Sequence, residues 1–187
     1  MTIESAALLI IDVQKGLEDP KWGPRNNPAA EQNIGRLLAY WRASSRPIIH
    51  IQHCSTEPES PLRPDRPGCA FQDVVEPQAG EPVFQKSVNS AFIGTALEAH
   101  LREQGINALV AVGLTTNHCV STTVRMAGNL GFTTFVVSDA TATFDREGPD
   151  GTVYKAAQVH DISLASLHGE FATVVTTETL LTPASVV

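Results

Sequence analysis

The chain has 187 residues, of which 42% are hydrophobic and 18% are charged. This composition can supply the core of one domain, and it excludes a disordered chain, a collagen-like repeat and a small disulfide-stapled protein. Thirteen Lys and Arg residues against twenty Asp and Glu residues give a net charge of −7. Because the sequence contains no basic cluster, we expect it to bind neither nucleic acid nor anionic membranes.

Two further features bear on the cell compartment. The apolar run near the N-terminus, residues 6–13, contains Asp12 and is too short to span a bilayer. The three cysteines, Cys54, Cys69 and Cys119, are odd in number and lack the spacing of a metal site. The sequence therefore predicts a reduced, cytoplasmic protein.

Short β-branched runs alternate with segments of helical periodicity from the N-terminus onward. Residues 6–13 form the first predicted strand. Asn27 and Pro28 begin a predicted helix, and a second strand follows at 47–52. The apolar face of that helix is predicted to carry Ile34, Leu37, Leu38 and Trp41.

A long loop is predicted at 54–81, where prolines recur and no convincing helix is present. A loop of this length in one domain is either functional or merely structural, and both interpretations stay open. We expect it to contribute a pocket wall at 61–71. The other walls are expected from 16–27, which contains Trp22, and from 144–150.

The strand–helix alternation continues in the second half of the chain. A short strand is predicted at 82–86, and a helix follows that begins at Asn89 and Ser90 and ends at Gly105. The apolar face of this helix is predicted to carry Ile93, Leu97 and Leu101. The remaining predicted elements are a strand at 108–113, a helix at 119–129, a strand at 132–138, a helix at 152–167 and a strand at 172–176.

The predicted strands are continuous apolar runs rather than alternating ones. This pattern indicates burial on both faces, as in a parallel sheet covered by helices. The sequence therefore predicts a single α/β doubly wound domain over residues 1–187. In such sheets ligands bind beyond the carboxyl ends of the strands, so the functional residues are expected there.

Three reactive side chains lie at these predicted strand ends. Asp12 is at the end of the first strand, Lys86 ends the third, and Cys119 follows the fourth through a short turn. Each has an ordinary alternative: a carboxylate that caps a turn, a solvated lysine and a small core thiol. Together they supply a nucleophile, a base that takes its proton and a cation that favours the charged form.

Cys119 is the sharpest of these signals because it is predicted to begin a helix. The positive end of the helix dipole and the exposed N–H groups there should lower the thiol pKa and hold an oxyanion. The adjacent His118 points in a different direction, so we expect it to line the pocket or pack beneath it rather than form a dyad. Cys54 and Cys69, in the long loop, receive no role.

The segments around these side chains resemble a known family. They read IDVQ around Asp12, FQKSVNSAF around Lys86 and GLTTNHCVSTTVRMAGNLGF around Cys119. These motifs resemble those of the isochorismatase-like cysteine hydrolases, a group that includes nicotinamidases and N-carbamoylsarcosine amidases. The similarity continues through VVSDATATF and LASLHGEFATVV, so it covers nearly the whole chain.

The resemblance implies a three-layer α/β/α sandwich with a six-stranded parallel sheet in the order 3-2-1-4-5-6. It also implies a catalytic triad of Asp12, Lys86 and Cys119, a cis peptide bond between Leu114 and Thr115, and an oxyanion hole formed by the N–H groups of Thr115 and Cys119. The third strand lies roughly 9–10 Å from the first in this order, so Lys86 must lean inward. Relatives form dimers or tetramers, so we expect a homo-oligomer.

The chain departs from nicotinamidases at their metal site. Those relatives carry an Asp-x-His pair after the second strand, where this chain has His53 and Ser55. We place His50 on the same strand face as His53, so the two could in principle share a metal. Two histidines without a carboxylate make a poor metal site, so we expect neither metal nor cofactor, and nicotinamide becomes a less favoured substrate.

Three functions stay open at this point. The first is Cys119-dependent hydrolysis of a C–N bond in a linear amide or ureide through a thioester. The second is vinyl-ether hydrolysis, as in isochorismatases proper, and the third is a non-catalytic binding domain with a redox-sensitive thiol. We favour the first, because Asp12 and Lys86 accompany the cysteine. The small-molecule substrate is expected in a pocket that includes Trp22, His53, Phe71 and His118.

Overall fold

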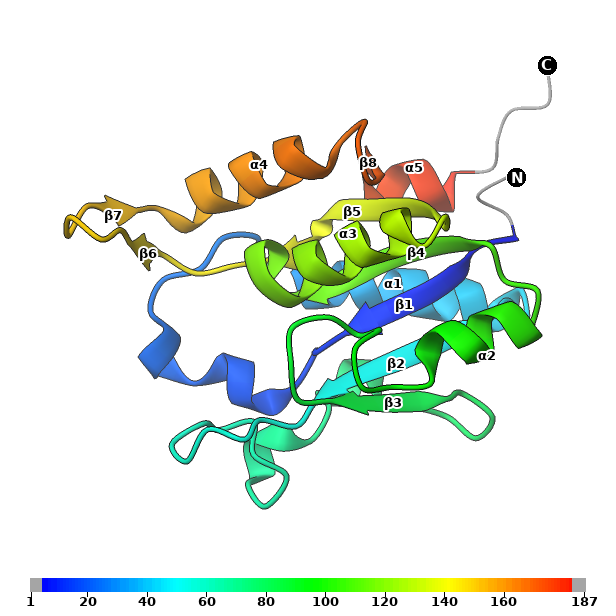
Figure 1. The fold of residues 1–187 in the computed structure, drawn as a ribbon, viewed down its shortest axis with the longest axis horizontal. Coiled ribbons are helices and arrows are strands. Elements are labelled where there is room, and N and C mark those ends of the chain that lie inside the picture. Colours follow the sequence, from blue (N-terminus) through cyan, green and yellow to red (C-terminus); the bar gives the residue numbers. More distant parts are fainter. Residues whose placement is uncertain (1–4, 183–187) are drawn as a thin grey trace.

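The computed structural model describes residues 5–182 and contains a central parallel sheet (Figure 1). Its strands are β1 (Ala7–Ile11), β2 (Ile48–His53), β3 (Val83–Lys86), β4 (Ala108–Leu114), β5 (Thr133–Ala142) and β8 (Thr173–Val175). They lie in the order β3-β2-β1-β4-β5-β8, which confirms the predicted order with β8 as the sixth strand. Residues 1–4 and 183–187, at the two ends of the predicted domain, lie outside the described residues.

Helices cover both faces of this sheet (Figure 1). They are α1 (Ala30–Ala43), α2 (Leu97–Glu103), α3 (Ser121–Asn129), α4 (Ala156–Leu167) and α5 (Thr177–Leu181). The side chains of β1 alternate between two cores: Leu8 and Ile10 join the side chains of α1, and Leu9 and Ile11 join those of α2, α3 and α4. The fold is therefore a three-layer α/β/α sandwich with β1 at its centre. No helix within residues 5–182 has the length and apolarity to cross a membrane.

The helix predicted from Asn89 to Gly105 is much shorter in the structure. α2 begins only at Leu97, and Ile93, predicted on its apolar face, is 51% exposed. Gly94 has a φ of 73°, which interrupts a helix, and the Thr95 hydroxyl accepts a hydrogen bond from the Leu97 N–H at 3.2 Å. Such local side-chain bonds compete with helical ones, so the first two predicted turns become an irregular segment.

The helix predicted at 152–167 also begins later. α4 starts at Ala156, whose N–H donates to the Asp145 carboxylate at 2.8 Å. The residues just before it form β7 (Val153–Tyr154), which pairs antiparallel with β6 (Arg146–Glu147). This hairpin projects from one end of the molecule (Figure 1). A two-stranded ribbon of this size carries too little apolar periodicity to be predicted from the sequence.

β5 is longer than the strand predicted at 132–138. A register shift between Ala111 and Gly113 lets β5 continue, so that Leu114 pairs with Ala142. Gly113 has a φ of 122°, and a Cβ there would lie 2.0 Å from the Ile11 carbonyl oxygen. A side chain cannot fit at this point, so glycine is required where β4 pairs with Ile11 of β1.

A partly buried ionic cluster joins α1, β2 and the turn before β3. Glu81 accepts a hydrogen bond from Arg42 Nε at 2.7 Å and lies 2.8 Å from His50 Nε2. Burial of Glu81 opposes its ionisation, but Arg42, the Gln78 N–H and His50 outweigh burial and lower the pKa of Glu81 to about 2. Burial lowers the pKa of His50, so its ring is mainly neutral at pH 7.

We expect Arg42→Gln to lower the free energy of unfolding at pH 7 by about 1–2 kcal/mol, because it removes the ion pair with Glu81. The effect is no larger because solvent screens the partly exposed guanidinium. A lowered pKa stabilises the fold above the ordinary value near 4.5, and this contribution is lost as the pH falls toward 2. The wild-type protein should therefore lose more stability than the variant between those pH values. Urea unfolding at several pH values measures both effects.

Arg36→Gln is the matched control for this cluster. Arg36 pairs with Glu178 at 3.1 Å, and these side chains are 47% and 73% exposed. An exposed pair of this kind should contribute little and leave the acid dependence unchanged. An equal loss of stability in the two variants would contradict the role given to the Arg42 cluster.

Candidate active site

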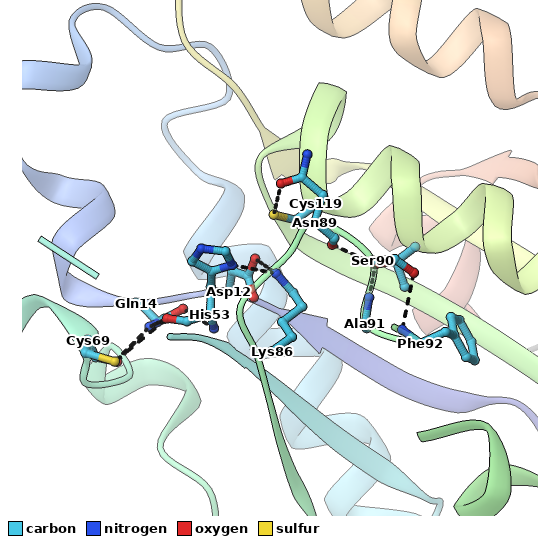
Figure 2. Close-up of polar contacts among 11 residues, drawn as sticks. Asp12, Gln14, His53, Cys69, Lys86, Asn89, Ser90, Ala91, Phe92 and Cys119 are labelled. Atoms are coloured by element: carbon cyan, nitrogen blue, oxygen red, sulfur yellow. Dashed lines mark hydrogen bonds and ion pairs between the residues drawn. The ribbon is translucent and has the colours of Figure 1, made fainter. Parts of the chain in front are cut away.

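The carboxyl ends of β1, β3 and β4 bring the three predicted catalytic side chains together. Asp12 directly follows β1, Lys86 is the last residue of β3, and Cys119 lies in the turn after β4. Lys86 Nζ donates to Asp12 Oδ2 at 2.6 Å, and the Cys119 Sγ lies within 4.8 Å of an Asp12 carboxylate oxygen. Figure 2 shows the three side chains in one region. Residues far apart in the sequence thus share one site.

Lys86 reaches Asp12 across β2, as the strand order requires. Its backbone pairs with that of His53, the last residue of β2. Its ammonium lies 3.1 Å from His53 Nδ1 as well as 2.6 Å from Asp12, and the side chain is fully buried. Because an ammonium can only donate, His53 Nδ1 is the acceptor and the ring is neutral. The lysine is therefore held between an imidazole and a carboxylate (Figure 2).

Asp12 is a buried carboxylate in which only one of the two oxygens is hydrogen-bonded within the described part of the chain. The residue is 2% exposed, and its Oδ1 has no hydrogen-bond partner among residues 5–182. Burial raises the pKa of Asp12, although the Lys86 ammonium opposes this rise. Asp12 consequently combines a fixed position with a free oxygen and an increased proton affinity, which are the properties of a general base.

Cys119 lies in a wide helical turn, Thr116–Val120, that precedes α3. The Leu114–Thr115 peptide bond at the start of this turn is cis. The Thr115 carbonyl accepts hydrogen bonds from the N–H groups of His118 at 3.1 Å and Val120 at 3.3 Å. The predicted helix at 119–129 therefore begins two residues late, at Ser121, and Cys119 lies in this wide turn rather than at a simple helix N-terminus.

Two hydrogen bonds connect this turn to His160 and Thr143, elsewhere in the fold. The Thr116 hydroxyl lies 2.9 Å from Nδ1 of His160, a buried residue of α4, and the Asn117 side chain accepts from the Thr143 hydroxyl. On the cavity side, the Cys119 thiol donates to Asn89 Oδ1 at 3.7 Å (Figure 2). The turn is thus fixed at both flanks of the cysteine.

The expected lowering of the Cys119 pKa is wrong. Burial and, after it, the negative charge of Asp12 raise the pKa of this thiol to about 12, and Lys86 only partly opposes them. Desolvation disfavours a thiolate more strongly than the turn and the lysine favour it. The resting cysteine is therefore protonated at pH 7, and a nearby base must remove its proton when it reacts.

A cavity of about 110 Å³ opens onto these groups. Trp22, His53 and His118 line it, as predicted, whereas Phe71 does not. Phe71 is 7% exposed and packs in the core, with its ring 5.7 Å from that of His50. Among the described residues, the lining consists of Asp12, Leu17, Trp22, His53, Leu62, Asn89, Leu114, Thr115, His118, Cys119, Phe144 and Arg146.

Five lining residues were missed at the sequence level: Leu17, Leu62, Asn89, Phe144 and Arg146. All except Asn89 lie in segments predicted to form pocket walls, but no periodicity indicates which side chain of a loop points inward. Phe144 stacks against Trp22 with ring centroids 6.0 Å apart, so one wall is aromatic.

A larger cavity of about 520 Å³ lies where β2 and β3 begin, and none of the triad residues lines it.

His50 and His53 do not share a site, and the expectation of one strand face for both is wrong. Residues three apart on a strand point to opposite faces. His50 accordingly contacts Glu81, whereas His53 contacts Lys86. Asp12, His53 and Cys119 place possible ligand atoms within 4.8 Å of one another, but the Lys86 ammonium occupies His53 Nδ1 and Asp12 Oδ2. These residues do not fit the metal site of nicotinamidases.

Comparisons with known proteins agree with this architecture. The isochorismatase domain family matches residues 6–179. The isochorismatase family protein YrdC of Bacillus subtilis is 51% identical over 178 residues, or 95% of each chain. Maleamate amidohydrolase of Pseudomonas putida is 30% identical over 187 residues, covering 91% of this chain and 82% of the relative. The crystal structure of an isochorismatase-family protein from Chromobacterium violaceum has a TM-score of 0.92 at 48% identity and covers 96% of this chain and 94% of that one. The chain therefore belongs to the isochorismatase family of hydrolases.

Proposed function

We propose that the chain is a cysteine-dependent amidohydrolase that cleaves a C–N bond of a small linear amide or ureide through a thioester. The observation that carries this proposal is the buried Asp12, whose Oδ2 binds Lys86 while its Oδ1 has no partner among residues 5–182. Asp12 lines the same cavity as the Cys119 thiol. The relationship to a maleamate amidohydrolase supports an amide substrate.

Proton transfer opens the proposed reaction. Asp12 takes the Cys119 proton through Oδ1 while Sγ bonds to the amide carbon, so a free thiolate need not accumulate at the raised pKa of about 12. Lys86 favours the ionised form of Asp12 before this step, against the effect of burial. The developing oxyanion is held by the backbone N–H groups of Thr115 and Cys119, which is the role predicted for them from the sequence.

Collapse of the tetrahedral intermediate completes the first half of the reaction. The C–N bond breaks, and Asp12 returns the proton to the departing nitrogen, so ammonia or an amine leaves and a Cys119 thioester remains. Water then gives a proton to Asp12, its oxygen bonds to the thioester carbon, and the C–S bond breaks. The carboxylic acid leaves, and the thiol regains its proton from Asp12.

Arg146 indicates that the substrate carries a negative charge. Its side chain lines the cavity, and its Nε is buried without a hydrogen-bond partner among the described residues. The Nη2 atom of the guanidinium lies 3.1 Å from His118 Nδ1. Burial lowers the pKa of His118, and the positive charge of Arg146 lowers it further. A carboxylate placed opposite the amide would pair with this guanidinium.

We expect Arg146→Ala to raise KM for carboxylate-bearing amides by about tenfold or more, because a charge-assisted hydrogen bond is lost. For neutral amides KM should change much less. Initial-rate kinetics on paired substrates, such as a dicarboxylic acid monoamide and its methyl ester, measure the difference. Lys155→Ala is the control, since this exposed cation lies near the same hairpin and does not line the cavity. Equal effects on both substrates would contradict the role given to Arg146.

The proposal is tested by screening small amides and ureides for ammonia release. The panel contains monoamides of dicarboxylic acids, carbamoyl amino acids and neutral amides, with pyruvate release from isochorismate measured in parallel. Ammonia release together with a Cys119 acyl adduct in mass spectra of quenched reactions is the expected result. Pyruvate release without ammonia from any amide would instead favour the vinyl-ether reaction.

A further inference from the structure

Two cysteines that the proposed reaction does not use lie next to each other. Cys54 directly follows β2, and Cys69 ends a short helical turn, Pro67–Cys69, in the loop before β3. Both are free thiols, and their sulfur atoms are 4.0 Å apart. A disulfide bond is about 2.05 Å long, so the two sulfurs need to approach by only about 2 Å.

Hydrogen bonds of Gln14 connect this thiol pair to the active site. The Gln14 Nε2 donates to the Cys69 carbonyl at 2.7 Å and to the His53 carbonyl at 3.0 Å. Its Oε1 accepts from the His53 N–H at 2.8 Å. Gln14 is completely buried, so these bonds have no competition from water. One side chain therefore ties the backbone of Cys69 to that of His53 (Figure 2).

His53 passes this connection on to the catalytic groups. Its backbone is held by Gln14, and its ring accepts a hydrogen bond from Lys86, which binds Asp12. A second connection runs through the loop between the cysteines. Leu62 lines the catalytic cavity, and its carbonyl accepts from the Ser55 N–H at 3.0 Å. A covalent bond between the two sulfurs would move the backbone near Cys54 and Cys69, and this movement would reach the cavity through both His53 and Leu62.

We propose that Cys54 and Cys69 form a redox-modification site whose reversible disulfide alters the catalytic cavity through Gln14, His53 and Leu62. The oxidant is a small disulfide of the glutathione type. One protein thiolate attacks the oxidant and releases one thiol, which leaves a mixed disulfide. The second protein thiolate then attacks the protein sulfur of that bond and releases the other thiol. The protein loses two protons and two electrons, and the oxidant is reduced to two thiols.

Cys54 is the thiol that reacts first. It is more exposed than Cys69, which is 6% exposed. Burial raises the pKa of Cys69 to about 11, and the adjacent Cys54 adds to this rise. Cys69, the more buried thiol with the raised pKa, therefore acts as the resolving thiol that attacks the mixed disulfide.

The first experiment treats folded Cys119→Ser protein with oxidised glutathione, so that the catalytic thiol cannot take part. We expect the intact mass to fall by two hydrogen atoms without a retained glutathione. Trypsin leaves both cysteines in one peptide, because Arg46, Arg63 and Arg66 each precede proline. A glutamate-specific protease cleaves after Glu59 and shows the link between the two halves. Cys54→Ser and Cys69→Ser should each prevent it, and glutathione adducts without a link would overturn the proposal.

The second experiment measures the effect on the cavity without any substrate. Iodoacetamide labelling of Cys119 is followed in its own tryptic peptide, before and after oxidation of the Cys54–Cys69 pair. We expect the labelling rate to change by at least about twofold and to return after reduction. The Cys54→Ser/Cys69→Ser double variant should show no change. A disulfide that leaves Cys119 labelling unaltered would refute the coupling, and neither result depends on the amidohydrolase proposal.

Discussion

Cys119→Ala should abolish amide turnover, with kcat reduced by about 10⁴-fold or more, and leave the fold intact. The variant removes the sulfur that forms the proposed thioester, and no other thiol of residues 5–182 lines the cavity. The stability cost should be within about 1 kcal/mol, because Cys119 is partly exposed and its thiol has one weak hydrogen bond, to Asn89. Steady-state ammonia release and thermal unfolding of the same preparation measure the two effects.

Cys69→Ala is the matched control for this loss. It removes a thiol from the neighbouring loop, and its Sγ lies 3.8 Å from the His53 carbonyl without lining the cavity. We expect its amide turnover to stay within a few-fold of that of the wild-type protein under reducing conditions. Amidase activity that survives in Cys119→Ala would end the thioester mechanism. Loss of ammonia release with retained pyruvate release from isochorismate would show two separate reactions in one cavity.

The sheet could be predicted because its sequence signal is strong and local. Residues of β1 such as Leu8 and Leu9 are buried on opposite faces, and a run that is apolar at every position indicates this directly. The place of Asp12, Lys86 and Cys119 follows from the same signal, since parallel strands end at one edge. The resemblance to the family supplied the strand order and the pairing of these residues.

The electrostatics of the site could not be predicted in the same way. The sign of the Cys119 pKa shift depends on how deeply the thiol is buried. The sequence indicates which groups lie near the thiol, but it does not indicate how far the fold removes the thiol from water. Phe71 shows the same limit, because a loop side chain can point into a cavity or into the core without any change of pattern. The late start of α2 comes from Gly94 and the Thr95 hydroxyl, which override the apolar spacing.

The homo-oligomer, the cytoplasmic location and the oxyanion-hole role of Thr115 stay predictions. Size-exclusion chromatography with light scattering tests the first of these. The triad needs no residue from a partner, because Asp12, Lys86 and Cys119 all come from the one chain.

Lys86→Met should both inactivate the protein and destabilise it, by about 3–5 kcal/mol at pH 8. The substitution leaves the Asp12 carboxylate buried without its cation, and the ionised form then has only the cost of desolvation. Asp12 should take up a proton and lose its capacity as a base. Lys15→Met is the control, because Lys15 forms an exposed pair with Asp73 at 2.8 Å and its loss should have no measurable effect on stability.

The double variant Asp12→Asn/Lys86→Met separates charge burial from catalysis. It removes both charges, so it should regain most of the stability lost in Lys86→Met while remaining inactive. The pH dependence supplies an independent check, because burial raises the pKa of Asp12 and the loss of Lys86 raises it further. Lys86→Met should become more stable as the pH falls below that raised pKa, since the folded state holds a proton that the unfolded state has released. Urea unfolding from pH 8 to pH 5 measures this, and an equal slope in the single and double variants would show that Asp12 is not the group involved.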